Sequence, residues 1–241
     1  MRDIVPFPGV PHTCSRETRL RVLRSVRWFR DLDEAELEHL NDRITSYAWD
    51  SHQRLQAEAE PASALHLIAA GSAIVLRARA DGTETIVDVA VPGDIVGVLP
   101  ELGQEVFTES VEALQPTCAL RIEAPLFRSM VTRHPSMALG VIEDLARRLE
   151  HARGVHAVSD ETVQERILHT LRRLVTTAGT RDDRGVLIDL PLGRAEIAGM
   201  AGTTQESASR VLSRLRRAGI IESGRRWTRV LDEDALAESR R

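Results

Sequence analysis

Glu206, Ser209 and Arg210 have the residue types and spacing best suited to reading base pairs. Ser209 and Arg210 lie three and four positions after Glu206, so a helix over this stretch carries all three on one face. An arginine pairs bidentately with O6 and N7 of guanine, and a glutamate accepts a hydrogen bond from N4 of cytosine. The spacing therefore predicts a helix that contacts base edges in a DNA major groove, with Glu206 holding Arg210 in place.

Two short helices around a tight turn are the predicted support for these side chains, over Gly193–Gly219. Ile197 and Met200 face inward on the first helix, and Gly202 gives the turn a residue that tolerates positive φ. Thr203 or Thr204 can cap the second helix, whose apolar face is made by Ala208, Val211, Leu212 and Leu215. This pattern is typical of a helix-turn-helix. An ordinary helical hairpin with a surface ion pair is the alternative.

The segment Ser223–Arg226 follows as the predicted tip of a β-wing. Arg225 and Arg226 would contact phosphates, which positions a protein on DNA without reading its sequence. We place Thr203 and Thr204 in the same phosphate-contacting group. Gln205 joins Glu206, Ser209 and Arg210 as a base-reading candidate.

Composition limits the other chemistry that is available. All 32 basic residues among the 241 are arginine, so a Schiff-base lysine and a phosphate-loop lysine are excluded. The two cysteines, Cys14 and Cys118, exclude a disulfide framework, a four-Cys zinc site and an all-Cys iron–sulfur cluster within one chain. The net charge is −4, yet Arg166–Val230 holds 13 arginines against 6 acidic residues. This favours a polyanion partner for that stretch, with a solvated helical surface as the alternative.

Periodicity divides the rest of the chain. Residues 1–18 are rich in proline and predicted to be a flexible tail, and residues 19–46 have helical spacing with Asp31 or Asp33 as a cap. Short apolar runs broken by Gly-centred turns follow up to about Ile122, which indicates an all-β sandwich or barrel. No apolar stretch reaches membrane-spanning length and no signal peptide is evident, so we expect a cytoplasmic protein without a membrane partner.

A long helix starting at Pro135 carries a narrow apolar seam. Its members alternate at spacings of four and three: Ala138, Ile142, Leu145, Leu149, Ala152 and His156. Such a seam favours a homodimeric coiled coil. The alternative is an amphipathic helix that packs on its own domain.

Together these motifs resemble the Crp/Fnr family of bacterial transcription regulators, from about Leu23 to Leu236. The most specific pieces are Pro92–Gly97, Leu190–Ala198, Thr204–Arg210 and Leu215–Ile221. The resemblance implies an α+β chain: a flexible tail (1–18), a β jelly-roll sensory domain of the cyclic-nucleotide-binding type (19–134), a dimerisation helix (135–160) and a winged helix-turn-helix domain (161–241). It further implies a homodimer that reads double-stranded DNA at a palindrome close to TTGA-N6-TCAA, with RNA polymerase as partner if it activates.

The sensory end departs from the relatives that bind cyclic nucleotides. Those proteins have a glutamate soon after the glycine turn and an arginine that holds the cyclic phosphate. Here Val98-Leu99-Pro100 follows the turn, and no arginine lies between Arg79 and Arg121. Glu101, Glu105 and Glu109 would put negative charge beside a phosphate. We therefore expect a signal other than a cyclic nucleotide.

The nature of that signal stays open at this point. We expect an effector pocket formed by His66, Gly97, Leu99 and His151, in which an imidazole could hold haem for sensing nitric oxide or carbon monoxide. A small unknown ligand, a redox signal at Cys14 or Cys118, and the absence of any effector are the alternatives. Cys118 also fits the role of a small buried hydrophobic residue.

Enzyme functions have little support in the sequence. A metal-binding cupin shares the β-barrel pattern but needs a cluster of histidines with a glutamate, whereas His66 stands alone in its strand. No nucleophile elbow, His-Glu-x-x-His motif or phosphate loop is present. We expect no catalytic residues, no metal site and no enzymatic activity.

Overall fold

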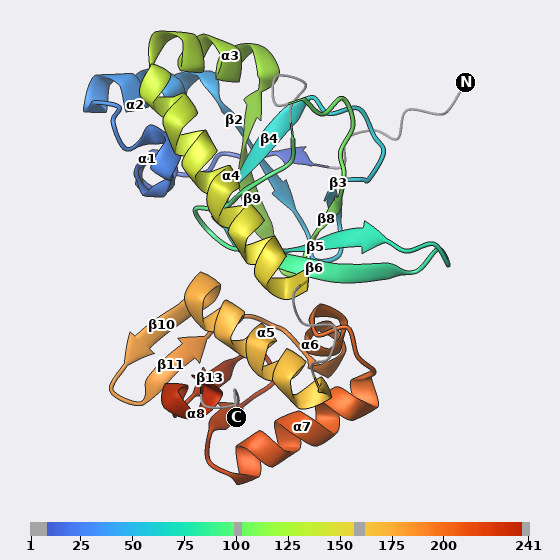
Figure 1. Ribbon diagram of the computed structural model, residues 1–241. Helices are drawn as coiled ribbons and strands as arrows, with labels where there is room; N and C mark the ends of the chain where they lie inside the picture. Colours follow the sequence, from blue (N-terminus) through green and yellow to red (C-terminus); the bar gives the residue numbers. More distant parts are fainter. Residues whose placement is uncertain (1–8, 99–102, 157–161, 238–241) are drawn as a thin grey trace. The chain divides into compact units, whose positions relative to one another are not determined.

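The computed structural model describes residues 9–98, 103–156 and 162–237, without the side chains of residues 147, 148 and 150–156. The chain forms two compact units. The first unit consists of residues 1–78 and 90–157, and the second of residues 79–89 and 158–241. Figure 1 labels the helices and strands of both.

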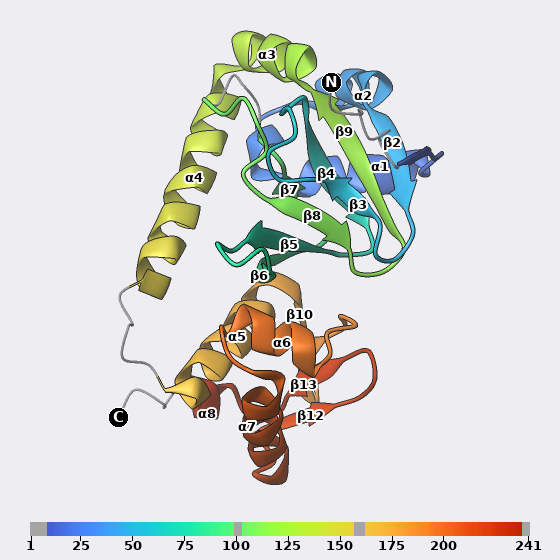
Figure 2. The ribbon, with the colours of Figure 1, turned by 90° about the vertical axis from the view of Figure 1, so that its right-hand side faces the viewer.

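The strand-rich stretch predicted from the Gly-centred turns is an antiparallel β-sandwich, as expected. Its larger sheet has the order β1-β2-β9-β4-β7 and its smaller sheet the order β3-β8-β5-β6. The strands are β1 (Val10–Pro11), β2 (Thr45–Trp49), β3 (Arg54–Gln56), β4 (Ala64–Ala70), β5 (Ala73–Ala78), β6 (Glu84–Ala90), β7 (Ile95–Val96), β8 (Ser110–Ala113) and β9 (Thr117–Glu123). Helices α1, α2 and α3 cover one side of the larger sheet, and the smaller sheet lies on its other side (Figure 2).

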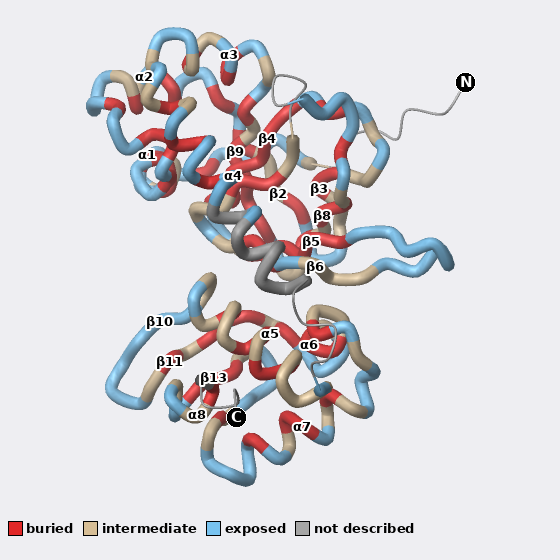
Figure 3. Tube along the Cα trace, in the orientation of Figure 1, coloured by how far each residue is buried: buried red, intermediate tan, exposed pale blue. Residues whose placement is uncertain are grey.

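Alternate side chains of β4 lie on opposite faces of the larger sheet. Leu65, Leu67 and Ala69 belong to the apolar cluster shared with the helices, whereas His66 packs edge-on against Trp49 on the opposite side of the sheet. Both faces of β4 are therefore buried, and its burial follows the near-continuous apolar run in the sequence. Figure 3 shows the same concentration of buried residues along the strands.

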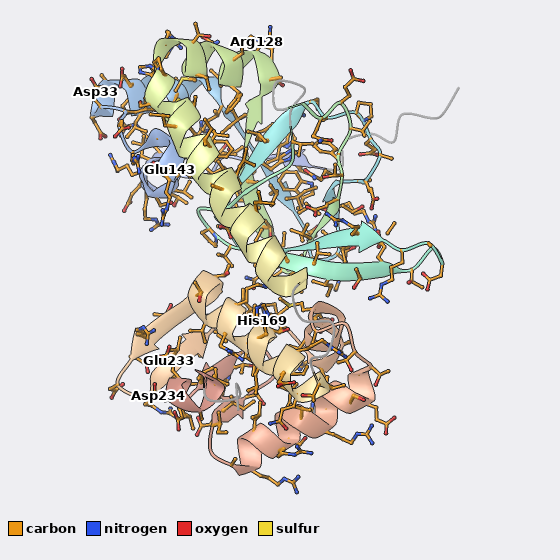
Figure 4. All side chains as sticks on the ribbon, in the orientation of Figure 1. Asp33, Arg128, Glu143, His169, Glu233 and Asp234 are labelled. Carbon is orange, nitrogen blue, oxygen red and sulfur yellow. The ribbon has the colours of Figure 1, made fainter. Side chains whose placement is uncertain are left out.

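Two helices of the first unit, α1 and α2, begin at a side chain that caps them. The helices are α1 (Arg16–Ser25), the 3-10 helix η1 (Arg27–Phe29), α2 (Glu34–Arg43), α3 (Ala124–Arg133) and α4 (Pro135–His156). Asp33, one of the two predicted caps and labelled in Figure 4, forms a capping box with Glu36 at the start of α2. The predicted helical stretch to residue 46 ends earlier, at Arg43, because Thr45 and Ser46 pair with β9.

The predicted tail over residues 1–18 is wrong from Val10 onward, while residues 1–8 lie outside the described part. Val10 and Pro11 pair with β2, and the His12 N–H donates to the Ser46 carbonyl oxygen at 3.0 Å. Ser15 then caps α1 by accepting from the Thr18 N–H. The prolines suggested a loose segment, but proline is compatible with an edge strand.

In the second unit, a four-stranded sheet supports the predicted helix-turn-helix. Its helices are α5 (Val163–Ala178), α6 (Arg194–Met200), α7 (Gln205–Arg217) and α8 (Glu233–Ala237). Its sheet has the order β10-β11-β13-β12, from strands β10 (Gly179–Asp182), β11 (Gly185–Ile188), β12 (Ile221–Ser223) and β13 (Thr228–Val230). The wing, β12 and β13, was predicted from the sequence, whereas the hairpin β10–β11 that pairs with it was not.

Candidate DNA-binding site

Helix α7 begins and packs as the sequence predicts. The Thr204 hydroxyl accepts a hydrogen bond from the Ser207 N–H, which satisfies one of the amide donors that a helix start leaves open. The apolar side chains Ala208, Val211, Leu212 and Leu215 are buried. The opposite face of α7 is therefore left to solvent.

That solvent face brings the predicted base readers together. Arg210 Nη1 lies 3.5 Å from Glu206 Oε1, and both side chains are largely exposed. Arg210 Nη2 also donates to the Ser207 hydroxyl at 3.4 Å. Gln205 is exposed at the first helical residue, and Ser209 is half-buried one turn further along. The Arg210 guanidinium is thus pre-oriented but accessible, as base recognition requires.

Arginines surround this face and form an open groove. Its lining consists of Arg194, Glu206, Ser209, Arg210, Ser213, Arg214, Arg216 and Arg217. Five cations against one carboxylate give the groove a positive potential, which attracts a polyanion such as a nucleic-acid backbone.

Arg194 is a member of this groove that the sequence analysis missed. It is the first residue of α6, and its Nη1 donates to the Ser209 carbonyl oxygen at 3.2 Å and to the Ser213 hydroxyl at 3.3 Å. The guanidinium therefore links the two helices on the groove side. The local excess of arginine was the available signal, but it did not single out this position.

The wing carries the predicted phosphate contacts at its tip. Ser223 pairs with Thr228, and the Gly224 N–H donates to the Trp227 carbonyl oxygen at 2.9 Å, which closes the turn. Arg225 and Arg226 are exposed between these strands. Of the two threonines proposed for phosphate contact, Thr204 already uses its hydroxyl as the cap of α7 and Thr203 is half-buried.

Ion pairs across the strands hold the wing to the missed hairpin. Buried Arg229, on β13, donates to the Asp182 carboxylate, and this bond lowers the pKa of Asp182. Arg184 Nη2 donates to Glu222 Oε2 at 2.9 Å. At the far edge Arg181 pairs with Glu233 of α8, which Figure 4 labels. The wing is therefore one edge of a sheet rather than an isolated hairpin.

In the first unit, helix α4 carries an exposed apolar stripe. We define the α4 stripe as Leu139, Ile142, Leu145 and Leu149, which are between 51% and 60% exposed. Three of them are predicted seam residues and Leu139 is an addition, while Ala138 is half-buried. The side chains of Ala152 and His156, the other seam residues, lie outside the described part.

The opposite side of α4 is fixed against η1. A β-carbon on Gly140 would stand 3.0 Å from the Trp28 Cα, so a larger residue here would require the backbone of η1 to shift. Glu143, labelled in Figure 4, accepts two hydrogen bonds from Arg30, at 3.0 and 3.1 Å. The α4 stripe is thus held outward by the packing of the helix.

Only part of the tentative effector pocket can be compared with the structure. His66 pairs with Val96, the neighbour of Gly97, so these two predicted residues lie close together. Leu99 and the side chain of His151 lie outside the described part. His66 is 2% exposed with both ring nitrogens buried, and burial, with the nearby Arg121 charge, lowers its pKa to about 3.

Apolar and amide groups occupy the space beside Gly97. Phe107 Cε1 and Gln56 Oε1 lie 3.5 and 3.0 Å from the point where a β-carbon on Gly97 would stand. Both side chains are buried, and Gln56 Nε2 donates to the Glu109 carbonyl oxygen at 3.1 Å. The Glu109 carboxylate pairs with Arg77 at 2.7 Å. Within the described residues, the groups next to Gly97 are thus an aromatic ring, a side-chain amide and the Ala64 carbonyl oxygen.

The described residues contain neither a metal-ligand cluster nor a membrane-spanning helix. Over 9–98, 103–156 and 162–237 there is no group of three or more His, Cys, Asp or Glu side chains placed to hold a metal ion. In the same ranges, none of the helices combines the length and apolar character needed to cross a bilayer.

Comparisons with known proteins agree with this architecture. Residues 48–134 match the cyclic nucleotide-binding domain family, and residues 165–239 match the Crp-like helix-turn-helix domain family. A CRP-like cAMP-activated global transcriptional regulator of Mycobacterium tuberculosis is 23% identical over 221 residues, which is 91% of this chain and 99% of that protein. The cyclic AMP receptor protein of Thermus thermophilus is 28% identical over 176 residues, covering 73% of this chain and 78% of that one.

A solved structure shows the same fold. FixK2 from Bradyrhizobium japonicum superposes with a TM-score of 0.71 at 22% identity, covering 80% of this chain and 96% of that chain. The sandwich, the helix-turn-helix and the wing together define a DNA-binding transcription regulator with a β-rich domain of the cyclic-nucleotide-binding type. The chain belongs to the Crp/Fnr family.

Proposed function

We propose that the chain binds DNA as a homodimer at a palindrome close to TTGA-N6-TCAA. The observation that carries this proposal is the exposed face of α7, where Glu206 and Arg210 are paired and accessible beside Ser209. Glutamate and arginine one helical turn apart suit a cytosine and a guanine in neighbouring base pairs. Half-sites about one helical turn apart suit two copies of α7 related by a two-fold axis.

The α4 stripe supports the dimer. Four large aliphatic side chains on one face of a helix are unfavourable in water, and a second copy of the same helix would cover them. A two-fold pairing uses the same patch on both chains, so no other surface is needed. Where the protein activates transcription, RNA polymerase is the further partner.

We propose that the controlling signal is not a cyclic nucleotide. The groups beside Gly97 are Phe107 and Gln56, neither of which offers a positive charge to a phosphate, and the cation Arg77 is already paired with Glu109. A cyclic phosphate needs a cationic or multiple-donor site to offset its desolvation. This chain is thus similar in fold to its cAMP-activated relatives, but we expect it to respond to a different signal.

Haem fits the described residues poorly. His66 is the histidine closest to Gly97 in the sheet register, and both of its ring nitrogens are buried beside Trp49. Binding of a haem iron atom at His66 would require the rings of His66 and Trp49 to move apart.

The proposed activity is binding of DNA, with no catalytic step.

The experiment is fluorescence anisotropy of the full chain with a TTGA-N6-TCAA duplex and with a scrambled duplex, at about 150 mM salt. Selective binding to the first duplex supports the proposed half-site. Equal binding to both, in protein shown by sedimentation to be dimeric, contradicts it. Calorimetric titration with cyclic AMP and cyclic GMP tests the signal, and saturable binding of either overturns that part.

A further inference from the structure

The fold brings Cys14 and Cys118, the two cysteines of the chain, to one place on the larger sheet. Cys118 lies on β9 opposite Ala48 of β2. Cys14 precedes α1, and its N–H donates to the hydroxyl of Ser46, two residues along the same strand, at 3.4 Å. Both cysteines belong to the apolar cluster between the sheet and the helices.

The Cys14 thiol lies close enough to Cys118 to influence its pKa. Burial, followed by the neighbouring Cys14, raises the pKa of Cys118 to about 12, while the charge of Arg19 acts in the opposite direction. Cys118 is therefore a protonated thiol, and Cys14 is its neighbour in the same apolar cluster between the sheet and the helices.

We propose that Cys14 and Cys118 are an oxidation site, at which a hydroperoxide joins them in a disulfide within one chain. The Cys14 thiolate attacks the O–O bond of hydrogen peroxide, which yields a sulfenic acid and one water after proton uptake. The Cys118 sulfur then attacks the sulfenic sulfur, and its proton leaves with the hydroxyl group as a second water. Two thiols and one peroxide thus give one disulfide and two waters.

The segment that contains Cys14 provides the movement that bond formation requires. An S–S bond is about 2.05 Å long, so the two sulfurs must move to within bonding distance of each other. Cys14 lies between β1 and the Ser15 cap of α1, in a stretch without helix or strand hydrogen bonds of its own. Cys118 is held on both sides, opposite Ala48 of β2 and Ala70 of β4. Cys14 is therefore the side expected to move and to meet the oxidant.

The disulfide would tie the start of α1 to β9. Because it closes a loop of roughly one hundred residues, the constraint on the unfolded chain is large, and the unfolding temperature should rise by roughly 5–15 °C. This effect belongs to the first unit and does not depend on DNA binding, so it stands or fails separately from the proposed function.

The test treats the full chain with hydrogen peroxide and, in parallel, with diamide, then digests it without reduction for mass spectrometry. We expect the free thiols to fall from two per chain to none, a linked peptide pair containing Cys14 and Cys118, and unchanged monomer mobility on a denaturing non-reducing gel. The reductant dithiothreitol should restore both thiols and the original unfolding temperature.

Single variants separate the two roles. In C118A, dimedone should trap a sulfenic acid at Cys14 and the unfolding temperature should not rise on oxidation. In C14A, Cys118 should remain a thiol. Over-oxidation of either cysteine without a link in the wild-type chain, a disulfide between chains, or two thiols that persist through both oxidants would each overturn the proposal.

Discussion

Arg166 holds the turn between the two helices of the helix-turn-helix through the carbonyl oxygen of Ala201. Its Nε–H donates to that oxygen at 2.9 Å, and Nη2 reaches the Gly202 carbonyl oxygen at 3.4 Å. Ala201 is the C-cap of α6, and Gly202 has a φ of 57°. Carbonyls at a helix end lack intrahelical donors, so a guanidinium there both satisfies them and complements the helix dipole. Arg166 therefore fixes where α7 begins.

Replacing Arg166 by glutamine should loosen this turn. Charge-assisted hydrogen bonds contribute about 1.5–3 kcal/mol, so R166Q should lower the unfolding temperature and reduce discrimination between the TTGA duplex and a scrambled one. Anisotropy and thermal unfolding measure the two effects. R172Q is the matched control, because the Arg172 guanidinium donates to the Leu168 carbonyl of its own helix. Equal behaviour of both variants would contradict the positioning role.

Removing Arg210 should affect specificity more than overall attraction. R210A removes a side chain that can pair with a guanine, so it should cost about 1–3 kcal/mol on the TTGA duplex and relax the base preference. R225A, at the tip of the wing, should weaken all duplexes alike and reduce the salt dependence by about one ion. Anisotropy with substituted half-sites over a salt series distinguishes the two. If R210A weakened every duplex equally, Arg210 would be a phosphate contact instead.

The parts predicted correctly from sequence are those encoded locally. Thr204, the apolar spacing of α7 and Gly202 specify the helix-turn-helix within a few residues, and Asp33 with Glu36 marks the start of α2. The alternation of short apolar runs likewise identified the sandwich. In each case the residues that specify the element lie close together in the sequence.

The features missed depend on contacts between distant residues. The strand β11 is short, and its burial depends on pairing with β13 more than forty residues later. Arg194 gains its place in the groove only when α6 packs against α7. The proximity of Cys14 to Cys118 depends on the segment between β1 and α1, where the Cys14 N–H donates to the Ser46 hydroxyl of β2. Charge counts and periodicity do not carry this information.

Placing a charge in the α4 stripe should weaken self-association. Leu145 is 52% exposed in the middle of the stripe, so L145E would bury a carboxylate against a second α4 in the proposed dimer. Sedimentation equilibrium should then report monomers at concentrations where the wild-type chain is dimeric. V10E is the control, because Val10 is 64% exposed on β1, outside the stripe. A dimer that persists in L145E would show that the stripe is not the interface.

Buried His66 should make the chain lose stability as the pH falls. Its pKa is lowered to about 3 in the folded state, chiefly by burial, against about 6.5 when unfolded. Below about pH 6.5 the unfolded chain therefore binds a proton that the folded chain does not. The unfolding free energy should decline by up to about 1.4 kcal/mol per pH unit from this group until the pH approaches 3.

Urea unfolding at about pH 7, 6, 5 and 4 measures the slope of the unfolding free energy against pH, and H66Q should make that slope shallower. H39Q is the control for losing an imidazole at an exposed position, and the comparison uses slopes because H66Q also disturbs the packing on Trp49. In the folded protein, the imidazole Hε1 resonance of His66 should keep its neutral-form shift across this range. A resonance that titrates near pH 6.5 would mean that solvent reaches the ring, and the space around Gly97 and Phe107 would then be open to a ligand.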